Sequence, residues 1–248
     1  MAKSKKKVAV KASKKKVAMK SPAILESIDE LASLYKQNKH IICAFYQLNN
    51  VLEPEALRRK AITGSTFRAF HINKKTSGSG MSFYFTKTIE RYILKNPTLH
   101  SVQSNFITDL SQITNGKFNN WHPDDNGMPK LMKLYNLYAN YWVAYNLAGQ
   151  FNQKLSSIRK LNVPLDKYSL TFISDLYNFS RRSSEKKLKG YLSMGKVIEM
   201  EQYNIINSFI TKLASDVTQM LGEEFCPIYL DIIQASQNKL GWYTNNIN

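Results

Sequence analysis

Apolar residues in the second half of the chain recur every three or four positions, the spacing of one face of an α-helix. The clearest run is a heptad-like seam, formed by Leu131, Tyr135, Tyr138, Trp142 and Tyr145. Helical spacing continues past this seam until Asn162-Val163-Pro164 interrupts it. The pattern predicts long amphipathic helices over residues 130–160, from about 166 to 189 and from 191 to 221, and a shorter helix after Pro227.

The first half contains shorter elements separated by turn-forming residues. Ser21-Pro22 has the serine and proline of a helix start, and apolar residues follow it at helical spacing. Residues 40–48 form a further element whose pattern fits either a helix or a strand. Glu53-Pro54 opens a helix that runs to about Ile62. Two more helices are predicted at 82–95 and 98–113, between loops at 63–80 and 115–129.

These elements define the expected fold class. No segment shows the sustained alternation of a strand, and no βαβ pattern occurs. We therefore expect an all-α fold, a helical bundle with long amphipathic C-terminal helices, preceded by a disordered basic N-terminal tail. The tail covers residues 1–20 and the helical domain 21–248, with a candidate internal boundary at 114–129.

The basic tail contains two near-identical nine-residue repeats, SKKKVAVKA and SKKKVAMKS. It contributes nine lysines and no acid to a chain whose formal net charge is +17. If all nine lysines contacted phosphates, the logarithm of the binding constant would fall with the logarithm of the salt concentration at a slope of about −8. The tail has no aromatic residue, so it predicts phosphate-backbone binding without sequence specificity; a solubilising extension or a targeting address is the alternative. The lysines are Lys3, Lys5, Lys6, Lys7, Lys11, Lys14, Lys15, Lys16 and Lys20.

A second basic cluster lies at the end of the helix predicted after Glu53. It contains Arg58, Arg59 and Lys60, and no acid occurs between Glu55 and Glu90. These three side chains are further candidates for contacts with DNA or RNA phosphates. A solvated helix end is the alternative interpretation.

The aromatic seam also has two interpretations. Tyr135, Tyr138, Trp142 and Tyr145 suit core packing or self-association as a coiled coil, and hence a homo-oligomer. Tyrosine and tryptophan also suit a boundary between apolar and wet surfaces. The same face is therefore a candidate for binding a partner protein or a hydrophobic granule surface.

No catalytic or metal-binding motif is recognisable in the sequence. The four histidines share no metal-ligand spacing, and Ser183-Ser184-Glu185-Lys186 matches the S-x-x-K motif without its companion motifs. We expect a non-enzymatic protein with no cofactor and no metal. Cys43 and Cys226 form no CxxC pair and are expected to be free thiols in a reducing compartment. The absence of a secretory signal and of a transmembrane segment favours a cytoplasmic location, nucleoid-associated in a bacterium.

Two family resemblances accompany these patterns. Through Lys5-Lys6-Lys7-Val8-Ala9 and Lys14-Lys15-Lys16-Val17-Ala18, the tail resembles lysine-rich histone H1-like bacterial tails, which implies DNA coating without sequence preference. Residues 130–221, with long amphipathic helices and scattered aromatics, resemble phasins, which implies a coat on polyester storage granules. We expect first a nucleic-acid (polyanion) binding or tethering protein whose helical domain oligomerises or docks a partner. The alternative is a phasin-like coat protein.

Overall fold

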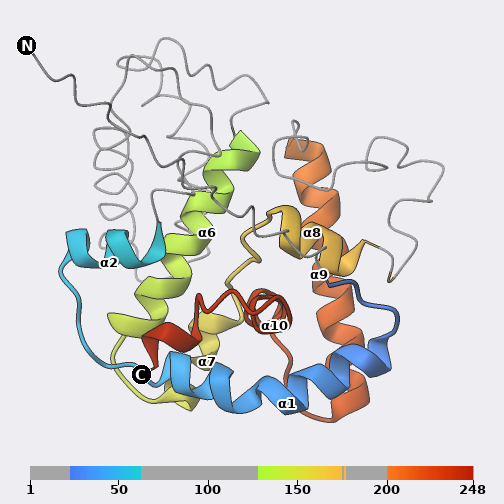
Figure 1. The fold of residues 1–248 in the computed structure, drawn as a ribbon, viewed down its shortest axis with the longest axis horizontal. Coiled ribbons are helices and arrows are strands. Elements are labelled where there is room, and N and C mark those ends of the chain that lie inside the picture. The colour runs from blue at the N-terminus through green and yellow to red at the C-terminus, as the bar shows by residue number, and fades with distance from the viewer. Residues whose placement is uncertain (1–22, 63–127, 175, 177–199, 248) are drawn as a thin grey trace, which may run out of the picture.

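The computed structural model describes residues 23–62, 128–174, 176 and 200–247 of the 248-residue chain. These residues form seven α-helices and one 3₁₀-helix and contain no strand, so the all-α expectation is confirmed for this part. The elements are α1 (Ile28–Tyr46), α2 (Pro54–Ala61), α6 (Met128–Tyr145), α7 (Phe151–Ile158), α8 (Lys167–Ile173), α9 (Met200–Leu221), α10 (Tyr229–Gln237) and η3 (Thr244–Asn246) (Figure 1). None of the described helices is both long and apolar enough to cross a membrane.

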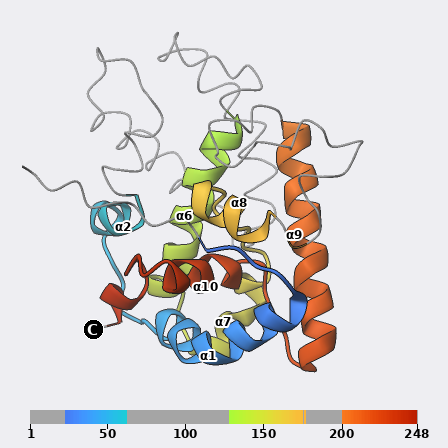
Figure 2. The same cartoon turned by 45° about the vertical axis from the view of Figure 1, so that its right-hand side comes forward.

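Helix α10 forms the centre of the described fold. Every residue from Tyr229 to Ala235 is buried, so no side of this stretch faces solvent. Figure 1 shows α10 nearly end-on between α6 and α9 and above α1. Figure 2 shows α10 between α1 and α8, and it packs against both. The buried polar side chains of a helix covered in this way are mostly hydrogen-bonded within the protein.

Helix α1 begins later than the sequence pattern predicts. Its N-cap is Ser27, whose Oγ accepts a hydrogen bond from the Glu30 N–H (3.0 Å), while the Glu30 carboxylate accepts one from the backbone before the cap (2.8 Å). Residues 23–27 are not helical, and the N–H of buried Leu25 donates to a carbonyl of α8 (2.8 Å). The predicted start at Ser21-Pro22 is therefore wrong, because the reciprocal cap and the docking of Leu25 hold the preceding segment out of the helix.

Several other boundaries agree with the predictions. Residues 40–46, left open between helix and strand, are helical, because α1 continues to Tyr46. Helix α2 begins directly after Glu53, α9 ends at Leu221, and a helix follows Pro227. The predicted break at Asn162-Val163-Pro164 is confirmed by the non-helical residues between α7 and α8.

The helix predicted over residues 130–160 is instead two helices, α6 and α7. The chain leaves the helix after Tyr145, and Gly149 takes a φ of +105°, which L side chains rarely adopt. The Gln150 N–H then donates to Gln153 Oε1 (2.7 Å) at the start of α7. The predicted helix from about 166 to 189 is also too long, since α8 ends at Ile173.

The conformation of Gly149 gives a test of this break. A Cβ added at Gly149 would lie 2.5 Å from Gln153 Oε1, whereas one added at Gly222, where φ is +67°, would meet nothing within 4 Å. We expect Gly149→Ala to lower the free energy of unfolding by about 2 kcal/mol or more, and Gly222→Ala by about 1 kcal/mol. Urea denaturation of both variants measures the difference. Equal losses would contradict a steric requirement for glycine at Gly149.

Lys154 of α7 is completely buried, which is rare for a lysine. Its Nζ donates to the carbonyl of Leu48, just after α1 (2.7 Å), and to that of Ala144, in the last turn of α6 (2.8 Å). Carbonyls at a helix C-terminus lack the N–H partner that the next turn would supply, and they favour positive charge. Lys154 therefore joins the ends of α1 and α6.

Several predictions lie outside the described residues. They are the tail at 1–20 with its nine lysines, the loop at 63–80, the helices at 82–95 and 98–113, most of the boundary at 114–129, and residues 177–199. Met128 and Pro129, placed in a loop by the sequence pattern, belong to the start of α6.

Candidate functional site

A cavity of about 280 Å³ lies beside the buried helix α10. Its walls come from the end of α2, one face of α6, the loop before α8, α10 itself and the C-terminal residues 240–245. Its volume is close to the lower end of small-molecule sites. We name it the α10 cavity, and its charged lining residues are Lys60, Lys133, Asp166 and Asp231.

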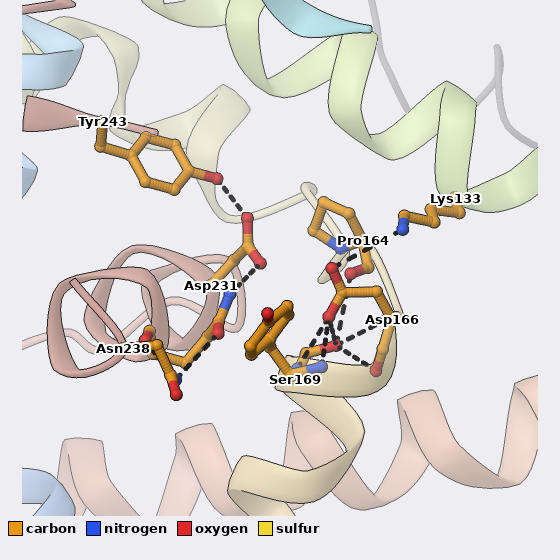
Figure 3. Close-up of polar contacts among 9 residues, drawn as sticks. Lys133, Pro164, Asp166, Ser169, Asp231, Asn238 and Tyr243 are labelled. Carbon is orange, nitrogen blue, oxygen red and sulfur yellow. Dashed lines mark hydrogen bonds and ion pairs between the residues drawn. The ribbon is translucent and has the colours of Figure 1, made fainter. Parts of the chain in front are cut away.

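Asp231 is the most deeply buried of these charged residues, with 1% of its surface exposed. Its carboxylate accepts hydrogen bonds from the hydroxyl of Tyr243 and, at 3.1 Å, from Gln234 Nε2 (Figure 3). Tyr243 and Gln234 are themselves buried. A carboxylate without partners would be very unfavourable in this apolar setting, and the two donors offset part of that cost.

The environment of Asp231 changes its acidity. Burial, and secondarily the nearby Asp166 carboxylate, raise the pKa of Asp231 from 3.8 to about 7. The hydrogen bonds from Tyr243 and Gln234 and the charge of Lys133 act in the opposite direction. Near neutral pH this carboxyl group therefore gains and loses a proton, a property found in acid–base and ligand-binding carboxyls.

Asp166 and Lys133 form an ion pair in the cavity wall. Lys133 Nζ lies 3.6 Å from Asp166 Oδ2, and each side chain is only 14% exposed. Asp166 is held as the N-cap of α8, since its Oδ1 accepts from the N–H groups of Tyr168 (2.8 Å) and Ser169 (2.9 Å) (Figure 3). One carboxylate therefore both caps a helix and balances the charge of Lys133.

A chain of hydrogen bonds connects Asp231 to two other helices. The Tyr243 hydroxyl, which donates to Asp231, accepts from Asn140 Nδ2 of α6 (3.2 Å). Asn140 Oδ1 accepts in turn from the Tyr46 hydroxyl of α1 (2.5 Å). All four residues are buried, so the chain fixes the C-terminal segment against the core.

No protein-family model, curated protein or solved structure matches this chain. A function must therefore follow from the charges, cavities and contacts of the chain itself. The two candidates are the lysine-rich tail and the α10 cavity.

The residues predicted to contact phosphates on α2 have acidic or aromatic partners. Arg58 donates to both carboxylate oxygens of Glu55, and Arg59 Nε donates to Glu55 Oε1 (3.1 Å). These hydrogen bonds, first those from Arg58, lower the pKa of Glu55 to about 2. Lys60 lies over the ring of Tyr145, 5.4 Å from its centroid, and lines the α10 cavity. The sequence interpretation did not pair the arginines with Glu55, which lies one turn before them and neutralises part of their charge.

Three members of the aromatic seam lie inside the chain's own core. Tyr135, Tyr138 and Tyr145 are at most 3% exposed, while Trp142 is half-buried. Helices α1, α2 and α9 pack against α6 and contribute to this burial. The partner-binding face predicted at these four residues is corrected accordingly, because the three tyrosines are covered by neighbouring helices and only Trp142 retains exposed surface.

Sequence reasoning missed Asp231, a buried carboxylate that lines the α10 cavity. One signal was present, since Asp231 is the single acid in the apolar run from Ile228 to Ile233. An acid in such a run indicates a buried charge that needs partners. Lys133 and Tyr243 carry no comparable signal, because they lie 98 and 12 positions from Asp231 in the sequence and meet it only in the folded chain.

Potential metal ligands do not cluster in the described ranges. Among the described ranges, no group of three or more His, Cys, Asp or Glu residues is placed to hold a metal ion. Cys43 and Cys226 are both free thiols, as predicted. His71, His100, His122 and the Ser183–Lys186 motif lie outside the described residues.

Proposed function

We propose that this protein is not an enzyme, that it binds nucleic acid or a comparable polyanion through its N-terminal tail, and that its helices form the folded anchor. The observation that carries the proposal is the charge density of the tail, with nine lysines and no acid in twenty residues. Lysine contacts phosphates as a point charge, and the tail has no aromatic ring to stack on bases. Binding therefore depends on the number of charges and not on base sequence.

The charge of the helical part supports this division of roles. Residues 21–248 contain 26 lysines and arginines and 18 acids, a formal excess of eight positive charges spread over 228 residues. The tail supplies nine of the 17 excess charges of the chain. Arg58 and Arg59 are already engaged by Glu55. Attraction to a polyanion is therefore assigned mainly to the tail.

The helical part then serves for attachment. We infer that its helices form a bundle that docks a partner or associates with further copies of the chain, in the cytoplasm and beside the nucleoid in a bacterium. A phasin-like granule coat has less support, because such a coat needs a continuous apolar face. The described residues expose four large apolar side chains on four different segments, namely Ile24, Val51, Met220 and Trp242.

Equivalent substitutions in the two tail repeats test the proposal. We expect Lys5→Gln/Lys6→Gln/Lys7→Gln and Lys14→Gln/Lys15→Gln/Lys16→Gln to weaken binding to duplex DNA by about a hundredfold each at about 0.1 M salt. Each triple variant should also make the salt slope less steep by about 2.7, because three phosphate contacts are lost. Fluorescence anisotropy of the full chain with labelled duplex DNA, repeated over a salt series, measures both quantities.

The control is Arg58→Gln/Arg59→Gln, which removes two positive charges that both pair with the single carboxylate of Glu55. We expect this variant to change the affinity by about threefold or less. If both tail variants bind duplex DNA as tightly as the unaltered full chain, the proposal is wrong. Unequal losses from the two repeats would contradict binding by charge number alone.

A further inference from the structure

The four charged residues that line the α10 cavity are all engaged by other groups of the chain. Lys133 Nζ and Asp166 Oδ2 form a 3.6 Å ion pair. The ammonium group of Lys60 lies over the ring of Tyr145, and this lysine is also exposed to solvent. The charges of these three residues are therefore compensated before any ligand enters.

The fourth charged residue, Asp231, is compensated in the same way. Its Oδ1 accepts a hydrogen bond from Gln234 Nε2 (3.1 Å), and its Oδ2 accepts one from the Tyr243 hydroxyl (Figure 3). A charged ligand would lose its own water in this cavity and would meet no charge that lacks a partner, whereas an uncharged ligand bears no such cost. The charge pattern of the cavity therefore favours an uncharged ligand.

The rest of the lining is largely apolar and aromatic. Leu137 and Tyr141 line the cavity from α6, and Leu240 and Trp242 line it from the C-terminal segment. The Tyr141 hydroxyl donates to the Trp242 carbonyl (3.1 Å), which holds the C-terminal segment against α6. The Trp242 ring meets the ring of Tyr168 edge to face, with 6.0 Å between centroids. Because aromatic rings favour offset-stacked and edge-to-face contacts with further rings, this lining suits a planar aromatic ligand.

The size of the cavity limits the ligand. An apolar cavity of about 150 Å³ in another protein binds benzene. The α10 cavity, at about 280 Å³, therefore has room for two fused rings. Trp242 is 37% exposed and also lines a second cavity of about 270 Å³, and this space allows its ring to move when a ligand enters.

From these observations we propose that the α10 cavity binds an uncharged, planar aromatic molecule of about two fused rings, such as an indole. The rings of the ligand contact Leu137, Tyr141 and Trp242. Release of water from these apolar surfaces drives binding. This site is separate from the proposed role of the tail and does not depend on it.

A set of matched probes tests the preference for an uncharged ligand. Fluorine NMR titrations of the full chain at about pH 8 compare 5-fluoroindole and 5-fluorotryptophol, which are uncharged, with 5-fluorotryptamine and 5-fluoroindole-3-acetate, which carry an ammonium group and a carboxylate. 5-Fluorotryptophol controls for size, since it has a hydroxyl where 5-fluorotryptamine has its ammonium group. We expect 5-fluoroindole to bind with a dissociation constant of about 0.1–1 mM, and both uncharged probes to bind about tenfold or more tightly than either charged probe. Equal or tighter binding of a charged probe, or no binding of 5-fluoroindole at millimolar concentration, would overturn the proposal.

A substitution that fills the cavity locates the site. We expect Leu137→Trp to weaken 5-fluoroindole binding about tenfold or more, because the larger side chain takes the space of the ligand. The matched control is Leu34→Trp, which should bind 5-fluoroindole as the natural protein does. Leu34 is likewise a half-buried helical leucine, on α1, and it lines neither of the two cavities. Circular dichroism confirms that each variant is folded, and full affinity in folded Leu137→Trp would show that the ligand binds elsewhere.

Lys133→Gln tests the charge argument without filling the cavity. This variant removes the cation that pairs with Asp166, so the wall gains an uncompensated negative charge. We expect the affinity for 5-fluorotryptamine to rise about threefold to tenfold, while that for 5-fluoroindole changes by about twofold or less. An unchanged affinity for 5-fluorotryptamine would mean that the paired charges of the wall do not determine which ligand binds.

Discussion

Replacing Lys154 by alanine is expected to lower the free energy of unfolding by about 3–5 kcal/mol. The variant removes the donor shared by the Leu48 and Ala144 carbonyls, so both lose a hydrogen bond at the ends of α1 and α6. It also leaves a cavity where the buried lysine stem had been. Burial removes water from the Lys154 ammonium group, which lowers its pKa, and the two carbonyl contacts offset part of this desolvation cost.

Urea denaturation of three variants separates these effects. Lys154→Met restores most of the side-chain volume without the hydrogen bonds, so its loss should be smaller than that of Lys154→Ala. Lys160→Ala removes an exposed lysine two residues beyond α7 and should change stability by about 0.5 kcal/mol or less. A loss below about 1 kcal/mol for Lys154→Ala would show that the two helix ends do not depend on this side chain.

The stability of the protein is expected to fall as the pH rises from about 4 to about 7, through Asp231. The pKa of Asp231 is about 7 in the folded chain, against about 4 for an unfolded aspartate. Between these values the folded state keeps a proton that the unfolded state releases, so raising the pH favours unfolding. The contribution of this one group is complete below about pH 4, is lost by about pH 7, and amounts to on the order of 4 kcal/mol.

Asp231→Asn should remove this pH dependence. The amide has nearly the same shape, carries no charge, and keeps an oxygen that accepts a hydrogen bond from Tyr243 or Gln234. Near pH 8 the variant should therefore be more stable than the natural protein, and near pH 4 this advantage should disappear. Urea denaturation of both proteins at about pH 4, 5.5, 7 and 8 measures the effect.

The matched control for this experiment is Asp29→Asn, which neutralises an exposed aspartate in the first turn of α1. Its effect is limited to the interaction with the helix dipole, a few tenths of a kcal/mol. The natural protein and Asp29→Asn should therefore share one pH profile. Parallel profiles for the natural protein and Asp231→Asn would instead mean that Asp231 keeps an ordinary pKa.

The helix boundaries show where local sequence is sufficient. Glu53-Pro54 marks the start of α2, and the end of α9 at Leu221 precedes Gly222, because proline and glycine restrict or permit particular backbone conformations by themselves. The start of α1, by contrast, could not be predicted from the local sequence alone. Ser21 and Ser27 both suit an N-cap, and the choice of Ser27 depends on the docking of Leu25 against α8.

The break between α6 and α7 shows the limit of periodicity. Apolar spacing continues through Tyr145 and Phe151, so the sequence predicted one helix. The left-handed conformation of Gly149 and the contacts of Lys154 with two helix ends favour the turn instead. Periodicity reports which face is buried, but it does not report where a tertiary contact compensates for ending a helix.

The sequence by itself determined the all-α class of the described part and the concentration of positive charge in the tail. Both depend on the composition and spacing of neighbouring residues, which act locally. Only the tertiary structure decided that Tyr138 faces the core and that Asp231 lines a cavity with Lys60. Some of the hydrogen bonds around this cavity join residues about a hundred positions apart, as from Asn140 to Tyr243. Such pairings arise from the packing of whole helices, and no short-range pattern encodes them.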